Sequence, residues 1–236
     1  MIRLRSLIFN LGMWIMVIPY ALLTLALIPM AAPKRSRIIA GWARFVVRWL
    51  ALACGLNYRV IGAENIQDHP CVILAKHQSA WETIAFQAIF PPQIWVLKRT
   101  LLLLPFFGWA LWALKSIAID RAAGREALKQ LVSQGKDRLA MGLSVVVFPE
   151  GTRIAPGEKG KYQIGGAWLA THTGATVLPV AHNAGEYWRK NSLLKYPGTI
   201  TVSVGKPINA AGMKADELNK MVEDWIESEM ARLDSL

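Results

Sequence analysis

The sequence contains few cysteine, histidine and acidic residues. Its 236 residues include two cysteines, four histidines and 16 Asp plus Glu, against 27 Lys plus Arg, which gives a formal net charge of +11. Cys54 and Cys71 cannot by themselves form a disulfide framework or a zinc site, so we expect two reduced thiols in the core. The basic excess predicts a polyanionic partner: nucleic acid, anionic lipid or a phosphate-bearing substrate. Ten tryptophans and long apolar runs favour the lipid.

Several common catalytic signatures are also absent. The sequence has no G-x-S-x-G nucleophile elbow, no Walker loop, no G-x-G-x-x-G after a predicted strand and no H-E-x-x-H helix. The few histidines and cysteines would make a metal cluster hard to assemble, so we expect no metal site. Charged residues make up only 18% of the chain, and disorder is therefore also disfavoured.

No charged residue occurs between Arg5 and Lys34. The 28 residues between them are long enough to cross a hydrocarbon core of about 30 Å as a helix. Pro19, in the middle, predicts either a kink in a single span or a break into a re-entrant hairpin. A cleaved signal peptide is disfavoured because the apolar stretch is too long and basic residues follow it.

The next segment, residues 38–56, predicts an amphipathic helix at a membrane interface. Arg44 and Arg48 are spaced i, i+4, with Trp42 and Trp49 nearby, which suits headgroups and the boundary beneath them. The alternative is a core-packing helix with a solvated basic stripe.

Charge is one-sided over the whole N-terminal part. Residues 1–63 carry eight Lys or Arg and no carboxylate, because the first acidic residue is Glu64. This pattern favours an anionic cytoplasmic leaflet and argues against nucleic acid. We therefore expect residues 1–56 to be a helical membrane-associated segment of a cytoplasmic (inner) membrane protein. The positive-inside rule favours re-entry or an in-plane helix pair over a single span.

From about Tyr58 short β-like runs alternate with helical ones. We predict strands at 58–62, 71–76, 93–98, 116–120, 144–149, 176–181 and 199–205, and helices at 81–90, 103–114, 122–142, 163–174 and from 214 onward. This alternation predicts an α/β domain over residues 57–236, facing the cytoplasm, with a mixed, largely parallel sheet flanked by helices. The run 199–205 alternates cleanly and favours an edge or antiparallel strand. Pro179 within 176–181 favours an edge strand.

His77 follows a predicted buried strand and precedes a helix. A side chain at the carboxyl end of such a strand points into the usual active-site crevice of α/β proteins. Glu82, five residues later, can hold one imidazole nitrogen and leave the other as a base. The alternative is structural, because residues 79–82 match a capping box in which Glu82 closes the helix N-terminus.

A polar turn, Glu150-Gly151-Thr152-Arg153, follows another strand at Pro149. Gly151 lets the backbone approach a ligand, Thr152 can donate, and Arg153 can bind a phosphate bidentately. The alternative is a solvated turn. A second basic group, Lys98, Arg99 and Arg121, flanks the apolar run 101–114, whose ends could equally be snorkelling side chains of a buried helix.

These motifs together resemble the glycerolipid acyltransferases, and most of all the bacterial 1-acyl-sn-glycerol-3-phosphate acyltransferases. That family has His-x4-Asp, then Lys-x2-Leu-x6-Gly-x12-Arg, then Phe-Pro-Glu-Gly-Thr-Arg, then Val-x-Pro-Val. The sequence offers these in the same order, from about residue 70 to 182: His77 and Glu82; Lys98, Leu101, Gly108 and Arg121; residues 148–153; and residues 177–180 with Pro179. The departure is Glu82 where the family has Asp, and its extra methylene can still reach the histidine.

The resemblance implies acyl transfer from acyl-CoA or acyl-carrier protein to the sn-2 hydroxyl of lysophosphatidic acid, giving phosphatidic acid with no metal or other cofactor. It implies the following roles: His77 as base and Glu82 as its partner; Arg153, Lys98 and Arg121 at the phosphate; Glu150 at the glycerol; Gly151 and Thr152 in substrate binding; Leu101, Gly108 and Pro179 in the acyl-donor or acyl-chain region. No serine or cysteine nucleophile is evident, which favours direct transfer.

The expected partners are membrane lysolipid, the acyl donor and an anionic membrane surface, with no nucleic acid. Three alternatives stay open at this point. They are an acyltransferase for another lysolipid such as lyso-ornithine lipid, an inactive membrane scaffold, and a nucleic-acid-binding protein that would rest on the basic charge alone.

Overall fold

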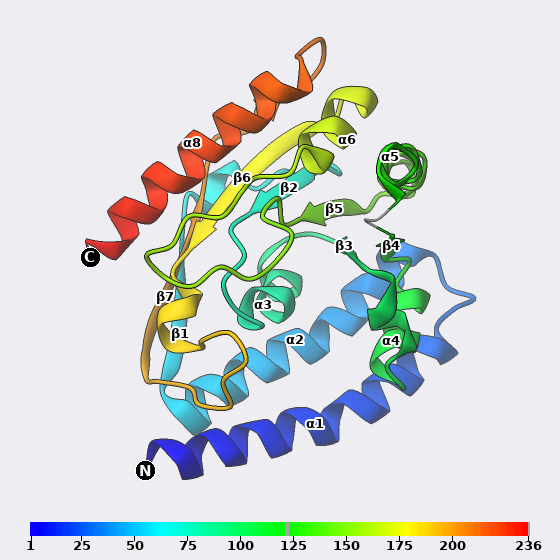
Figure 1. Ribbon diagram of the computed structural model, residues 1–236. Coiled ribbons are helices and arrows are strands. Elements are labelled where there is room, and N and C mark those ends of the chain that lie inside the picture. Colours follow the sequence, from blue (N-terminus) through cyan, green and yellow to red (C-terminus); the bar gives the residue numbers. More distant parts are fainter. Residues whose placement is uncertain (121–122, 236) are drawn as a thin grey trace.

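One mixed sheet organises the protein. The computed structural model describes residues 1–120 and 123–235 (Figure 1). The strands are β1 (Leu56–Ile61), β2 (Val72–Ala75), β3 (Gln93–Lys98), β4 (Ile117–Ile119), β5 (Ser144–Val147), β6 (Thr176–His182), β7 (Gly198–Val204) and β8 (Ile208–Asn209). Their order is β1-β7-β6-β2-β5-β3-β4, with β8 beside β6. Among the described strands, the antiparallel pairings are β6 with β7 and β6 with β8, and the other pairings are parallel. The predicted mixed, largely parallel sheet is confirmed.

Helices cover both faces of the sheet. They are α1 (Ile2–Ala26), α2 (Ala32–Cys54), α3 (Trp81–Ile89), α4 (Phe107–Ala113), α5 (Arg125–Ala140), α6 (Gly165–Thr173), α7 (Ala184–Tyr187) and α8 (Ala215–Asp234), with 3₁₀ turns η1 (Ala63–Asn65) and η2 (Arg99–Leu103). In Figure 1, α8 and α6 lie on one side of the sheet and α1, α2 and α3 on the other. The central strands β2 and β5 are buried at every residue. This explains their unbroken apolar sequences, since a parallel strand covered on both faces has no polar side.

Pro179 lies in an internal strand, so the prediction of an edge strand is wrong. β6 pairs with β2 on one side. On its other side, residues 176–177 pair with β8 and residues 180–182 with β7. Pro179 falls at the change of partner, where no ladder bond from its nitrogen is needed, and its carbonyl accepts from Gly205 N at 2.9 Å. The segment 199–205 corresponds to β7, which is antiparallel to β6 as expected, but it is internal and pairs with β1 in parallel.

The two N-terminal helices form an antiparallel hairpin. α1 continues through Pro19, so the predicted break there is wrong, and the chain reverses between α1 and α2 instead. Buried residues on both sides of Pro19, Met13 before it and Ala21 after it, hold α1 against the protein. At the reversal, the guanidinium of Arg35, only 2% exposed, donates to the carbonyls of Leu27, Ile28 and Met30. A cation at carbonyls left open by a helix end is favourable.

α1 buries a mixed side, which includes Phe9 and Met13, and exposes a long apolar face. Ser6, Asn10 and Thr24 are buried. The exposed face carries Ile2, Leu4, Leu7, Ile8, Leu11, Trp14, Ile15, Ile18, Leu22 and Leu23. Among the described helices, α1 alone is long and apolar enough to cross a membrane, judged by length and composition. An exposed apolar face of this size indicates association with a membrane.

α2 packs one side against the core and exposes a basic stripe on the other. Val46, Val47 and Leu50 are buried in the same core as the sheet and α3, while Arg44 and Arg48 are exposed. One hydrophobic core therefore includes side chains from both sides of residue 56. The division into a membrane segment, residues 1–56, and an acyltransferase domain, residues 57–236, stays a prediction.

Lys195 fastens α1 to the loop after α7. Its ammonium, in a residue only 2% exposed, donates to Asn10 Oδ1 at 2.7 Å and to the Leu193 carbonyl at 2.9 Å. It also lies 4.3 Å from the ring centroid of Trp188. Its backbone N–H donates to Ser6 Oγ. Burial lowers the pKa of Lys195 from an ordinary 10.5 to about 8.

This lowered pKa predicts how pH affects the stability of the hairpin junction. Between about pH 8 and pH 10.5 the unfolded chain holds the Lys195 proton that the folded protein has released, so the free energy of unfolding rises with pH. Relative to Lys195→Met, the wild type should gain about 1–2 kcal/mol between pH 7.5 and 9.5. Unfolding in detergent micelles at both pH values measures the gap, and a gap independent of pH would contradict the shifted pKa.

Candidate active site

The carboxylate of Glu82 holds both the histidine and the loop before α3. Its Oε1 lies 2.9 Å from His77 Nδ1 and accepts from the backbone N–H groups of Gln78 at 2.9 Å and Ser79 at 2.8 Å. The two interpretations of Glu82, helix cap and imidazole partner, therefore hold at once. Ser79 completes the cap, because its Oγ accepts from Trp81 N and donates to the Trp188 carbonyl.

The charge of Glu82 is compensated inside the core. The side chain is fully buried, and burial alone would raise its pKa. The imidazoles of His182 and His77 and the N–H of Ser79 outweigh burial and bring the pKa of Glu82 below its ordinary value. Glu82 is therefore ionised near neutral pH, as a carboxylate must be to stabilise an imidazolium on His77.

His77 has one ring nitrogen left for chemistry. Glu82 occupies Nδ1, and the ring stacks on Phe148 with centroids 4.1 Å apart. The backbone is held as well, since His77 N donates to Glu150 Oε2 at 2.7 Å and its carbonyl accepts from Ile154 N. The side chain lines a cavity. Nε2, on the far side of the ring from Nδ1, is the candidate base.

The Phe148–Arg153 turn supplies part of the same cavity wall. Gly151 has φ of 70°, in the left-handed region that glycine adopts without strain. Gly151, Thr152 and Arg153 all line the cavity. Glu150 is not among the lining residues. Its buried carboxylate accepts a hydrogen bond from the His77 N–H and forms an ion pair with Lys76. This geometry favours a role in positioning His77 over the expected contact with the glycerol.

Lys76 is a buried cation that the sequence reasoning missed. Its residue is 1% exposed, and Nζ lies 2.8 Å from Glu150 Oε1 and 2.9 Å from Glu227 Oε1 of α8. Tyr162 also donates to Glu227 Oε1, at 2.8 Å. Burial would lower the pKa of Lys76, but the two carboxylates raise it above its ordinary value. A lysine at the end of an apolar run has the same sequence pattern whether it is buried or exposed.

His182 was missed although a signal for it existed. It ends β6, which pairs with β2 in parallel, so it meets the same criterion that singled out His77. Its Nε2 donates to the Lys76 carbonyl at 2.9 Å, and its Nδ1 accepts from Ala184 N. Burial lowers the pKa of His182, consistent with the neutral tautomer that these two bonds require. His182 therefore holds the start of the loop between β2 and α3, residues 76–80, which carries His77 and is called the catalytic loop below.

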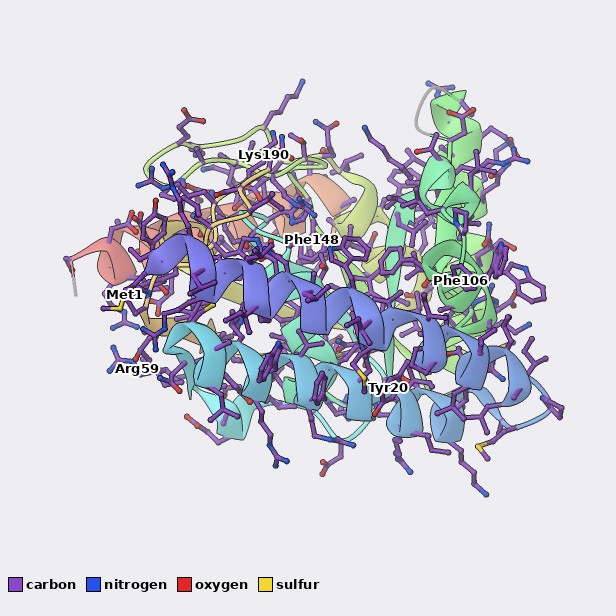
Figure 2. The ribbon with its side chains drawn as sticks, turned by 90° about the horizontal axis from the view of Figure 1, so that it is seen from below. Met1, Tyr20, Arg59, Phe106, Phe148 and Lys190 are labelled. Carbon is purple, nitrogen blue, oxygen red and sulfur yellow. The ribbon has the colours of Figure 1, made fainter. Side chains whose placement is uncertain are left out.

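The cavity has a volume of about 390 Å³ and a largely apolar wall. α1, α2, α3, β3, η2 and α4 contribute Val17, Tyr20, Ile39, Trp42, Ile84, Trp95, Leu101, Phe107, Leu111 and Leu114, among others. Among the described residues, the cations that line it are Lys98, Arg153 and Lys190. Figure 2 shows α1 and α2 side by side across this face, with Phe148 and Lys190 on the other side of α1 from α2 in this view. Lys190 was not predicted from the sequence.

Two of the predicted residues lie outside the cavity wall. Gly108 is not in the cavity wall, and a Cβ there would come within 2.4 Å of the Leu102 carbonyl, so glycine permits the close packing of α4 on η2. Pro179 is on the opposite face of the sheet, next to Gly205 and near Trp225 of α8. Arg121 lies outside the described residues. Within residues 1–120 and 123–235, no three His, Cys, Asp or Glu side chains come together as a metal site.

Comparison with known proteins agrees with this geometry. Residues 57–183 match the acyltransferase family. A 1-acyl-sn-glycerol-3-phosphate acyltransferase of Pseudomonas aeruginosa is 48% identical over 207 residues, covering 85% of this chain and 80% of that protein. The chain belongs to the 1-acyl-sn-glycerol-3-phosphate acyltransferase family.

More distant members of this acyltransferase family match as well. The 1-acyl-sn-glycerol-3-phosphate acyltransferase beta of Homo sapiens is 26% identical over 188 residues, covering 78% of this chain and 66% of that protein. The crystal structure of the 1-acyl-sn-glycerophosphate (LPA) acyltransferase PlsC from Thermotoga maritima superposes with a TM-score of 0.81 at 22% identity, over 100% of this chain and 99% of that one. This structural likeness supports the fold.

The buried ion network of this acyltransferase predicts a large loss of stability in Lys76→Met. The variant leaves the Glu150 carboxylate buried without its cation, which should cost roughly 3 kcal/mol. The matched control is Lys159→Met, which removes an ion pair to Glu223 that is largely exposed at Lys159 and should have little effect on stability, because solvent screens the pair. Thermal unfolding of both variants in detergent measures the difference, and equal midpoints would show that the buried pair adds nothing.

Proposed function

We propose that this chain transfers a fatty acyl group from an acyl thioester to the sn-2 hydroxyl of 1-acyl-sn-glycerol 3-phosphate, forming phosphatidic acid. The observation that carries the proposal is the His77–Glu82 pair in the wall of an apolar cavity that also presents Lys98 and Arg153. The name of the Pseudomonas relative supports the same reaction. A site of this composition suits a ligand that has an acyl chain, a hydroxyl and a phosphate.

The reaction is a direct transfer with His77 as general base. Nε2 of His77 takes the proton of the acceptor hydroxyl as its oxygen attacks the thioester carbonyl, and Glu82 stabilises the imidazolium. The new C–O bond forms, the C–S bond breaks, and the imidazolium returns the proton to the departing thiolate. Neither cysteine is placed to act as a nucleophile, since Cys54 and Cys71 are buried and burial raises the pKa of Cys71 to about 11.

The charges of the cavity favour a phosphate-bearing acceptor. Arg153 offers a planar fork that matches phosphate oxygens, and Lys98 adds a second charge from β3. Arg121 stays a prediction for the same ligand. Thr152 and Gly151 contribute polar contacts at the turn, and Leu101 adds an apolar contact for an acyl chain. An ornithine lipid has no phosphate, and because its carboxylate is accompanied by an ammonium, its headgroup carries no net negative charge to match these cations.

α1 places the cavity against the lipid surface. Its residues Val17 and Tyr20 line the cavity, while its opposite side is exposed and apolar. Leu103, Leu104, Trp109 and Trp112, from η2 and α4 and the residue between them, are also exposed. A single-chain lipid could therefore pass from the bilayer into the site without crossing water.

α1 lies in the membrane plane, on the cytoplasmic side of the inner membrane. The α/β part holds α1 along its length, through Lys195 near its start and the cavity wall further on. Arg5 Nε donates to the carbonyl of Ala53 at the end of α2, so the start of α1 stays with the rest of the protein. The basic groups at both ends then meet anionic headgroups on one side. The acyl donor, acyl-CoA or acyl-carrier protein, approaches from the cytoplasm, and nucleic acid is no partner.

Substitution of His77 tests the reaction. His77→Ala should lower turnover by roughly 10²–10⁴-fold, because it removes the base while leaving the fold. Glu82→Gln should cost less, and Glu82→Asp least. The assay uses purified protein in detergent, labelled acyl-CoA and a panel of lysolipids. Turnover of His77→Ala within a few-fold of wild type would rule out the role of His77, and no turnover of lysophosphatidic acid by the wild type would overturn the proposed function.

Cysteine labelling tests the orientation of α1. Cysteines in place of Arg3 and Lys34 mark the start of α1 and the start of α2, and native Cys54 and Cys71 are buried and give little background. Both new thiols should resist an impermeant maleimide in intact cells and react after permeabilisation. A cysteine in place of exposed Lys129 of α5 reports the side of the α/β part. Labelling of Arg3→Cys alone in intact cells would establish a single span.

A further inference from the structure

Lys190 is a third cation in the cavity wall, outside all four sequence motifs. It follows α7 and lies beside the Phe148–Arg153 turn, because its Nζ donates to the Arg153 carbonyl at 2.9 Å. It lines the same cavity as His77, Thr152 and Arg153. One hydrogen bond leaves two of the three ammonium protons for a ligand.

The segment that carries Lys190 is held on both sides. Just before it, the Trp188 carbonyl accepts from Ser79 Oγ at 2.6 Å, which ties the segment to the catalytic loop. After it, Lys195 and the Leu193 carbonyl bind Asn10 of α1. The backbone that carries Lys190 is therefore held in place, and the exposed side chain is directed to the turn by its bond to the Arg153 carbonyl.

The charge around the cavity exceeds what a phosphodiester needs. Lys98, Arg153 and Lys190 line it, and no Asp or Glu is among the described residues that do so. Glu82 and Glu150 lie behind the wall and are compensated by their own partners. A phosphomonoester carries a charge of about −1.5 to −2 near pH 7, against one negative charge for a diester. Three cations suit the monoester.

We propose that Lys190 is a specificity-determining residue that binds the second charge of a phosphomonoester headgroup. It selects lysophosphatidic acid over lysolipids whose phosphate carries a further alcohol. The proposal rests on the function proposed above and deepens it, because it assigns headgroup choice to a side chain outside the motifs that carry the chemistry. Charge-assisted hydrogen bonds to phosphate are strong enough to provide this discrimination.

A pair of non-reactive inhibitors isolates the charge. Hexadecyl phosphate and its methyl ester share one chain and one phosphate, and differ in one ionisable oxygen. Inhibition constants against acyl transfer are measured for wild type, Lys190→Gln, Lys190→Arg and the neighbour control Arg189→Gln. The control removes the same charge from the adjacent residue, whose guanidinium lies 6.0 Å from the Tyr196 ring centroid and not in the cavity wall.

The wild type should bind the monoester more tightly than the diester. Lys190→Gln should reduce that preference by roughly tenfold, through the monoester alone, with the KM for the thioester unchanged. Lys190→Arg should retain the preference, and Arg189→Gln should leave it intact.

Equal weakening of both inhibitors in Lys190→Gln would show a general electrostatic effect and overturn the assignment, as would a matching effect in Arg189→Gln. If the wild type acylates no lysophosphatidic acid, the proposed function fails instead, and direct binding of the two inhibitors still tests Lys190.

Discussion

Glu82 carries a negative charge in the interior of the protein, and the geometry of the catalytic loop follows from how that charge is compensated. A buried carboxylate is costly unless hydrogen bonds replace its hydration. Here the N–H groups of Gln78 and Ser79 and the ring of His77 do so at Oε1, while Oε2 lies 4.0 Å from His182 Nε2. The loop can bring all three to one oxygen only if it turns directly into α3. The hydrogen bonds that keep Glu82 ionised therefore also fix the orientation of the His77 ring.

A second buried charge connects that loop to distant parts of the chain. Lys76 joins Glu150, from the turn after β5, to Glu227 of α8. Such a network adds little stability over a well-packed apolar one, because desolvation offsets the attraction. The network instead holds the catalytic loop in place, because Glu150 accepts from the His77 backbone N–H and His182 donates to the Lys76 carbonyl. The carboxyl ends of β2, β5 and β6 meet because the strands are parallel, and the site lies where they meet.

The N-terminal hairpin links the chemistry to the lipid surface. α1 buries Ser6, Asn10 and Thr24 among apolar side chains and exposes most of its large apolar residues, unlike a helix on a water-soluble surface. Its inner side binds Lys195 near the start of the helix and forms part of the cavity wall further along. The exposed apolar face and the cavity wall are thus two sides of one helix, so movement of α1 on a membrane would also change the shape of the cavity.

The sequence by itself determined most of the elements, though not β8 or α7, and the parallel character of the sheet, the apolar N-terminus and the pairing of His77 with Glu82. Each of these depends on periodicity or on residues five positions apart. Tertiary structure decided the rest. Pro19 within a continuous helix and Pro179 within an internal strand depend on neighbours that local rules for proline do not include. Lys76 reaches a carboxylate 151 residues away, and Lys190 a carbonyl 37 residues away. A lone basic residue has the same local sequence pattern whether it is solvated, paired or aimed at a ligand, and only the folded chain brings its partners to it.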